Sequence, residues 1–211
     1  MSMDIKAQLG HVRWIGGGSG GGKSTVAERL AVAHGLRLYH TEPFSKYSNR
    51  LRAEDAPLLH AFAEMDMDER WVNRSPQVMY ETFHGFSGET FGLVVEDLLD
   101  LGNGTPVLAE GFVLLPRLVA PLLTDQHQAV WLLPTPEFRR AAFDHRGSTW
   151  TIANKTSDPD AALANLLARD QLFTEEVRRQ AAALNLPSVE VDGSLIVDDL
   201  VQHVAEILRL A

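Results

Sequence analysis

The stretch from Gly17 to Thr25, GGSGGGKST, restricts the fold of this chain more than any other part of the sequence. It matches the phosphate-binding pattern G-x-x-x-x-G-K-[ST]. Glycines fill five of the six positions from Gly17 to Gly22, so few side chains shield the backbone N–H groups that bind phosphate oxygens. Such a loop runs from a strand into a helix N-terminus, whose free N–H groups and dipole favour an anion.

The residues on both sides of the glycines suit that setting. Residues 11–15 are a short β-prone run, and residues 25–34 place apolar side chains on one helical face. Gly35 follows where a helix commonly ends on a glycine. The predicted nucleotide-binding residues are Gly17, Gly18, Ser19, Gly20, Gly21, Gly22, Lys23, Ser24 and Thr25.

Three of these residues carry specific predictions. Lys23 is expected to reach the β- and γ-phosphates of a nucleotide, and the Ser24 hydroxyl to bind the Mg²⁺ that bridges them. Thr25 is expected beside the innermost phosphate. The alternative, a flexible glycine-rich linker, does not explain the strand and helix on either side.

Composition limits the remaining possibilities. A chain of 211 residues with 45% apolar content suits one domain, 1–211, with a sizeable core. The net charge of −9 argues against general nucleic-acid binding, and the chain has no cysteine for a disulfide or thiolate site. The first ten residues lack the apolar core of a signal peptide, so we expect a soluble cytoplasmic protein without membrane partners.

Strand-like and helical segments alternate along the whole chain. In addition to residues 11–15, the expected strands are 36–40, 106–109, 129–133 and 187–191. Helical segments follow the strands, and the last helix is expected at 197–208. This alternation predicts an α/β fold in three layers, with a parallel sheet between two helical layers.

Residues 45–101 are too long for an ordinary crossover and have helical patterns, so they are expected to form a helical cap over an acceptor site. The aromatic residues of this cap are interpreted mainly as its own core. If the acceptor carries a phosphate, Arg74 is the first candidate to bind it.

Glu110 ends the third expected strand and is followed by Gly111. A carboxylate at the tip of the strand beside the phosphate loop can hold the water shell of Mg²⁺. The predicted metal-binding residues are therefore Ser24 and Glu110.

The segment 137–170 is expected to act as a lid. Thr135 and Pro136 can start its first helix, and Asp158 with Pro159 can start a long one that ends near residue 184. Residues 147–158 are polar and unperiodic, which is typical of a loop that closes over a ligand.

Taken together, the loop, a glutamate after the second strand, the helical insertion, Glu110-Gly111 and an arginine-bearing lid resemble the small P-loop kinases. The uridine-kinase-like and adenylate-kinase-like enzymes look most similar. The resemblance covers nearly the whole layout, but only the phosphate loop is a specific match. It implies a five-stranded sheet in the order 2-3-1-4-5.

By the same resemblance, Glu42 orients or deprotonates the acceptor hydroxyl, and lid arginines stabilise charge on the transferred phosphoryl group. The sequence departs from the uridine-kinase-like pattern, which often has two aspartates where Glu42 and Pro43 stand here. Arg140 and Arg146 are the predicted catalytic arginines, beside Lys23 and Glu42; the full set of candidate lid arginines is Arg139, Arg140, Arg146 and Arg169.

The predicted function is an ATP- and Mg²⁺-dependent phosphotransferase acting on a small molecule such as a nucleoside or nucleotide. The alternative from another class is a regulatory module that binds ATP and hydrolyses it slowly, because a phosphate loop fixes the ligand and not the task. A GTPase is disfavoured: residues 154–158 place the aspartate one position too late for the guanine-specifying segment, and no Asp-x-x-Gly follows the third strand.

Overall fold

The computed structural model describes residues 4–41, 45–102, 104–146 and 152–210. Within them lie five strands: β1 Val12–Gly17, β2 Arg37–His40, β3 Val107–Glu110, β4 Ala129–Pro134 and β5 Ser188–Val191. All the pairings between them are parallel, in the order β2-β3-β1-β4-β5. The expected α/β fold and strand order are thereby confirmed, and every expected strand lies within two residues of an observed one.

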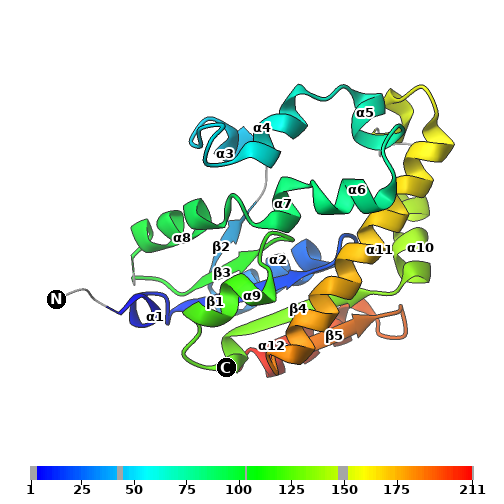
Figure 1. Ribbon diagram of the computed structural model, residues 1–211. Helices are drawn as coiled ribbons and strands as arrows, with labels where there is room; N and C mark the ends of the chain where they lie inside the picture. The colour runs from blue at the N-terminus through cyan, green and yellow to red at the C-terminus, as the bar shows by residue number, and fades with distance from the viewer. Residues whose placement is uncertain (1–3, 42–44, 103, 147–151, 211) are drawn as a thin grey trace.

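The helices surround this sheet and rise above one end of it (Figure 1). In chain order they are α1 Ile5–Gln8, α2 Lys23–His34, α3 Ser45–Ser48, α4 Pro57–Glu64, α5 Met67–Trp71, α6 Pro76–Glu81, α7 His84–Ser87, α8 Phe91–Asp100, α9 Pro116–Val119, α10 Pro136–Arg146, α11 Pro159–Ala183 and α12 Val197–Ile207. Short 3₁₀ helices, η1 Ala120–Leu122, η2 Gln126–Gln128 and η4 Ala153–Lys155, link some of them.

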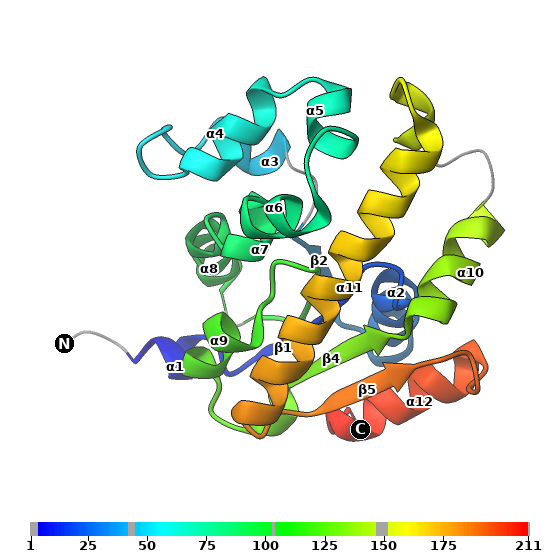
Figure 2. The same cartoon turned by 45° about the vertical axis from the view of Figure 1, so that its right-hand side comes forward.

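The two faces of the sheet bury different side chains of the same strands. On β4, Trp131 and Leu133 belong to a core cluster with residues of α8, α9 and α11, whereas Val130 and Leu132 pack with residues of α2 and α12. Strands covered on both faces are continuously apolar, as β4 is. The sheet is therefore the middle layer of three (Figure 2).

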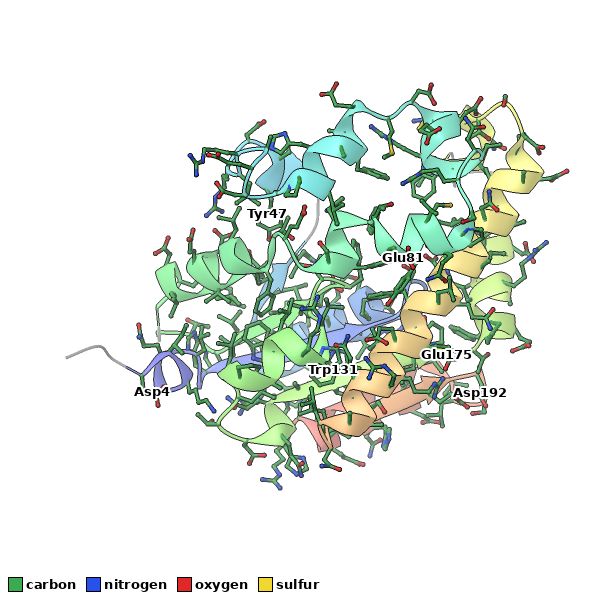
Figure 3. The ribbon with its side chains drawn as sticks, viewed as in Figure 1. Asp4, Tyr47, Glu81, Trp131, Glu175 and Asp192 are labelled. Carbon is green, nitrogen blue, oxygen red and sulfur yellow. The ribbon has the colours of Figure 1, made fainter. Side chains whose placement is uncertain are left out.

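Trp131 fixes the middle of that core. Its side chain is fully buried, and its indole N–H donates to the Leu114 carbonyl at 2.7 Å. Figure 3 shows it inside the molecule, while Glu175 and Asp192 lie toward the outside.

The segment 45–101 is helical, as expected, but it does not all stand away from the sheet. Helices α3 to α7 rise above one end of it (Figure 2), whereas Leu93, Val94 and Leu98 of α8 pack into the cluster that contains Trp14 and Trp131. Helix α8 is thus part of a covering layer, because its apolar face meets the sheet.

Helix ends agree closely with the local sequence. Phe138 N donates to the Thr135 hydroxyl at 3.2 Å at the start of α10, and Ala161 N donates to Asp158 Oδ1 at 3.0 Å at the start of α11. Gly35 ends α2 in the left-handed conformation, with φ of 62°. Helix α2 begins at Lys23, which places its N-terminus directly after the glycines.

In the described part of the chain, no helix combines the length and apolarity that a membrane crossing requires.

Candidate nucleotide and acceptor site

The phosphate loop connects β1 to α2 and bends tightly at its first residue. Gly17 has φ of 122°, and a Cβ atom there would collide with the backbone of Leu132 on β4. Gly18 N donates to the Leu132 carbonyl at 2.9 Å, which holds the loop against the sheet. The glycine at position 17 is therefore required both by its backbone angle and by the close approach of β4.

Lys23 lies within the curve of this loop. Its ammonium donates to the Gly18 carbonyl at 2.8 Å, and the side chain is buried. The first turn of α2 thus presents a cation and free backbone N–H groups at the same place, which suits a polyphosphate. Thr25 is exposed on the same turn.

Glu110, the second predicted metal-binding residue, lies beside the phosphate loop. Its Oε1 accepts from the Ser24 hydroxyl at 3.2 Å and lies 2.6 Å from His40 Nδ1 at the end of β2. The Glu110 side chain is buried, at 7% exposure. Because β1, β2 and β3 are parallel neighbours, their carboxyl ends meet here, as the sequence predicted for Glu110 and Ser24.

This oxygen set fits Mg²⁺, which keeps several waters and needs only one or two protein ligands. Among the described residues no group of three or more His, Asp or Glu side chains could enclose a metal ion. Ser24 and Glu110 are thus the residues that would hold Mg²⁺, together with the phosphates of a nucleotide.

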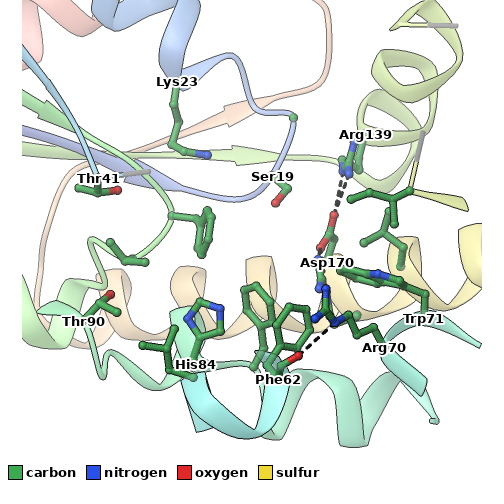
Figure 4. Close-up of a pocket in the computed structure, with 18 of the residues that line it drawn as sticks. Ser19, Lys23, Thr41, Phe62, Arg70, Trp71, His84, Thr90, Arg139 and Asp170 are labelled. Carbon is green, nitrogen blue, oxygen red and sulfur yellow. Dashed lines mark hydrogen bonds and ion pairs between the residues drawn. The ribbon is translucent and has the colours of Figure 1, made fainter. Parts of the chain in front are cut away.

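A cavity of about 590 Å³ opens in front of the loop. Figure 4 shows Lys23 and Ser19 on one side and Phe62 and His84 on the other. The lining residues come from the loop, the strand ends, the cap helices, α10 and α11; among them are Ser19, Gly20, Lys23, Ser24, Thr41, Phe62, Arg70, Trp71, Phe83, His84, Glu110, Arg139, Arg169 and Asp170.

The cap wall of the cavity is aromatic. The Phe62 and Phe83 ring centroids are 5.2 Å apart and nearly perpendicular, and Phe62 meets Trp71 edge-on at 6.0 Å. Phe86 stacks on Phe173 of α11 at 3.8 Å. Phe62 and Trp71 belong to the core cluster of the cap, as expected, whereas Phe86 packs in the cluster that contains Trp131. Phe62, Trp71 and Phe83 also face the cavity.

His84 lies in the same wall. Burial, with a smaller contribution from the charge of Arg169, lowers its pKa from 6.5 to about 4. His84 is therefore neutral at pH 7 and adds no charge to the cavity.

The candidate arginines do not all lie at the cavity. Arg139 and Arg169 are buried and line it. Arg140 is exposed, lies 3.5 Å from Asp144 and lines a smaller cavity of about 250 Å³ between α10 and α11. The Arg146 side chain and all of Glu42 lie outside the described residues.

Asp170 joins the two buried arginines, although no motif of the sequence predicts a role for it. Its Oδ2 accepts from Arg139 Nε and Nη2 at 3.1 and 2.8 Å, and its Oδ1 accepts from Arg169 Nε and Nη2 at 3.2 and 2.7 Å. A sequence signal exists: residues 169 and 170 interrupt the apolar stripe of Leu166, Phe173 and Val177. Charged residues in such a stripe indicate buried ion pairs.

Two other arginines of the cap, Arg70 and Arg74, bond to groups of the cap. Arg74 donates to the Glu69 and Arg70 carbonyls and to the Thr82 hydroxyl, at 2.8, 3.2 and 2.8 Å. Arg70 donates to the Phe62 and Ala63 carbonyls. Arg74 is not among the residues that line the cavity.

The segment 154–158 also has a structural role. Asn154 and Lys155 lie in η4, and the Asp158 carboxylate caps α11 instead of pointing to a base-specific site. This placement gives no support to the guanine-recognition interpretation.

Comparisons with known proteins give only distant similarities. No protein-family model matches the chain, and no curated protein matches it. Solved structures similar to it include deoxyadenosine kinase from M. mycoides with bound dCTP, at 14% identity over 94% of this chain and 98% of that one, with a TM-score of 0.48. The same kinase with bound dATP is 14% identical over 94% of this chain and 99% of that one, with a TM-score of 0.49. An uncharacterized protein from Eubacterium ventriosum is 12% identical over 94% of this chain and 97% of that one, with a TM-score of 0.41.

At such scores the fold assignment rests on the chain's own features. These are the strand order β2-β3-β1-β4-β5 and a glycine-rich loop between the central strand β1 and the N-terminus of α2. The chain has the fold of the P-loop NTPases.

Proposed function

We propose that the chain transfers the γ-phosphoryl group of ATP to a hydroxyl group of an uncharged, ring-bearing small molecule, with a nucleoside as the fitting class. One observation carries this proposal. A single cavity of about 590 Å³ is bounded by the phosphate loop on one side and by aromatic side chains of the cap on the other. A phosphate tail and an aromatic acceptor can therefore occupy it together.

The donor side of the reaction follows from the loop. Lys23 and the backbone N–H groups would bind the phosphates, and Ser24 and Glu110 would hold Mg²⁺. The metal supplies charge that stabilises the phosphates during transfer. Thr25 remains a predicted contact to the innermost phosphate.

Arg139 is the arginine that the geometry favours for contact with the transferred group. Its side chain is buried at the cavity and lies against Gly20 of the phosphate loop. Arg140, one residue later on α10, points to the solvent side and pairs with Asp144. The predicted role of Arg140 is therefore less well supported than that of Arg139, and the role of Arg146 stays a prediction.

Two arginines of the cavity wall already have protein partners, which favours a neutral acceptor, although Lys155 of η4 also lines the cavity. Arg169 is paired with Asp170, and Arg70 donates to two backbone carbonyls. Arg74, which a phosphorylated acceptor would need, is held within the cap. The rings of Phe62, Trp71 and Phe83 offer stacking and edge contacts for a planar group.

The reaction that this arrangement supports is an in-line displacement. The acceptor oxygen bonds to the γ-phosphorus as the bond to the β,γ-bridging oxygen breaks, and ADP leaves. The acceptor proton passes to a carboxylate, for which Glu42 is the predicted group.

The test is a transfer assay with γ-labelled ATP, Mg²⁺ and a pool of nucleosides, nucleotides, sugars and alcohols. Label on a nucleoside supports the proposal, whereas release of free phosphate alone supports the regulatory ATPase. The product of transfer to a nucleoside is a labelled nucleoside monophosphate. A labelled nucleoside diphosphate would mean that a nucleoside monophosphate is the acceptor, and it would contradict the neutral acceptor.

Lys23→Ala should reduce transfer by at least about 100-fold, because it removes a preorganised charge at the phosphates. Lys6→Ala, at an exposed position on α1, is the matched control and should transfer at the wild-type rate. Undiminished transfer by Lys23→Ala would show that the loop does not serve catalysis.

A further inference from the structure

The strongest unassigned feature is the buried carboxylate of Asp170. Its side chain is 2% exposed and stands between Arg139 on α10 and Arg169 on α11. Each carboxylate oxygen accepts two hydrogen bonds from one guanidinium, through Nε and Nη2. Such two-point contacts fix the orientation of an arginine as well as its position.

The guanidinium group of Arg139 lies against the phosphate loop, with Nη1 slightly closer to Gly20 than Nε. A Cβ atom built on Gly20 would lie 2.8 Å from Arg139 Cδ and 3.1 Å from its Nη1. With Nε and Nη2 directed to Asp170, Nη1 is the donor nearest the loop. Figure 4 shows the bonds between Arg139 and Asp170 beside the cavity, on the side of Ser19.

Arg169 connects the same carboxylate to the cap. Its guanidinium carbon lies 5.0, 4.8 and 5.2 Å from the ring centroids of Trp71, Phe83 and Phe86. These contacts are cation–π interactions, which favour a guanidinium over aromatic faces. One carboxylate therefore links the phosphate side of the cavity with its aromatic side.

We propose that Asp170 is a positioning residue that directs Arg139 at the terminal phosphate of the bound nucleotide and braces this position against the cap through Arg169. The inference rests on the proposed function and assigns a role that motif analysis does not give. Asp170 itself does not touch the transferred group.

Asp170 can orient Arg139 because its negative charge offsets the two positive charges of Arg139 and Arg169 in a buried position. Two arginine side chains this close repel each other unless an anion lies between them, and burial strengthens that repulsion. Without the carboxylate, Arg139 would lose the bonds that orient it and would turn toward other acceptors or solvent.

Nucleotide affinity measured by calorimetry tests this role. The probes are the Mg²⁺ complexes of ADP and of the β,γ-imido analogue of ATP, which has a terminal phosphate that cannot be transferred. Asp170→Asn should weaken binding of the analogue by about tenfold or more, the effect of a lost charge-assisted hydrogen bond, and change ADP affinity by less than about twofold. Glu175→Gln, which changes an exposed carboxylate on the same helix, should change neither affinity.

Equal weakening for both nucleotides, or unchanged affinity for the analogue, would overturn the inference, because a merely structural residue does not distinguish a triphosphate from a diphosphate. If Asp170→Asn does not fold, Arg139→Lys replaces it. A lysine keeps the positive charge but cannot donate twice to Asp170 and also face the loop. The same selective loss of affinity for the ATP analogue is therefore expected. Unchanged affinity for the analogue would again overturn the inference.

These results separate the inference from the proposed function. Selective loss in the variants without any phosphoryl transfer by the wild type would refute only the proposed function. A wild-type protein that binds neither nucleotide would refute both.

Discussion

Glu110 shows how one buried carboxylate gains its role from the strand that carries it. It ends β3, and the parallel register places it opposite Ile15 of β1 and His40 of β2. Ser24 and His40 both bond to the same oxygen, Oε1, and the metal role proposed for Glu110 would use its other oxygen, Oε2. The sequence predicted Glu110 beside the phosphate loop, where the structure places it next to Ser24, and its role at a metal stays a prediction.

Glu110→Gln should weaken metal binding in the nucleotide complex by about tenfold, the typical effect of changing a metal's outer partners. Electron paramagnetic resonance of Mn²⁺ with the protein and ADP measures it without turnover. The control is Glu96→Gln, an exposed residue that pairs with Arg50. Equal Mn²⁺ affinity in both variants would show that Glu110 does not take part in metal binding.

His84 gives the fold a defined pH dependence. Its pKa in the folded chain is about 4, below the 6.5 of the free side chain, so the unfolded chain binds the proton first as the pH falls. The free energy of unfolding should then fall between about pH 6.5 and pH 4, by about 1.4 kcal/mol per pH unit from this group. Urea unfolding of the wild type and His84→Gln at several pH values checks this, and parallel pH curves would contradict it.

Arg139 and Arg140 illustrate what the sequence could not provide at the scale of single residues. Successive residues of an α-helix point about 100° apart, so the two arginines need not face the same surface. Which of them faces the cavity depends on how α10 packs against the loop and α11. The partner of Arg139, Asp170, lies 31 positions away, and no local pattern indicates that pairing.

At the scale of helices and strands, the sequence was most informative where the controlling interactions are local. The caps Thr135 and Asp158 and the terminal Gly35 were predicted because capping depends on a few neighbouring residues. The strands were recognised from continuous apolar runs. The sequence places helix α8 in the cap with the rest of segment 45–101. An apolar helix face shows that the helix is packed, but not whether it packs on the sheet or on the other cap helices.

Asp158→Ala should lower the free energy of unfolding by about 1 kcal/mol, since it removes the side-chain acceptor at the start of the 25-residue helix α11. Asp160→Ala, two residues later in the first turn, removes only a favourable charge and should cost less than about 0.5 kcal/mol. Denaturant unfolding of both variants measures the difference. Equal losses would mean that the cap bond contributes little.

At the scale of the whole molecule, the site lies where the layers meet. The carboxyl ends of the central strands carry the glycine-loop side of the cavity, and the cap with α11 carries its aromatic side. The sequence predicted this division from the alternation of strands and helices and the long segment between the second and third strands. It could not predict the cavity itself, because its walls come from segments more than 100 residues apart, such as Phe62 and Arg169.

Binding of the Mg²⁺ complex of ATP should stabilise the whole fold by mass action. At a ligand concentration about 100 times the dissociation constant, the free energy of unfolding should rise by about 2.7 kcal/mol. Lys23→Ala, at the same ligand concentration, should gain much less. A thermal unfolding series with and without nucleotide measures both, and an equal gain would place the nucleotide elsewhere.

The position of Trp71 has a practical optical consequence. Trp14 and Trp131 are 1% and 0% exposed within the sheet core, whereas Trp71 forms part of the cavity wall. An acceptor that stacks there would alter the emission of Trp71, while Trp14 and Trp131 keep a steady background; the fourth tryptophan, Trp150, lies outside the described residues. Subtracting the spectrum of Trp71→Phe isolates this signal, so the protein carries its own fluorescent reporter with which to screen acceptors.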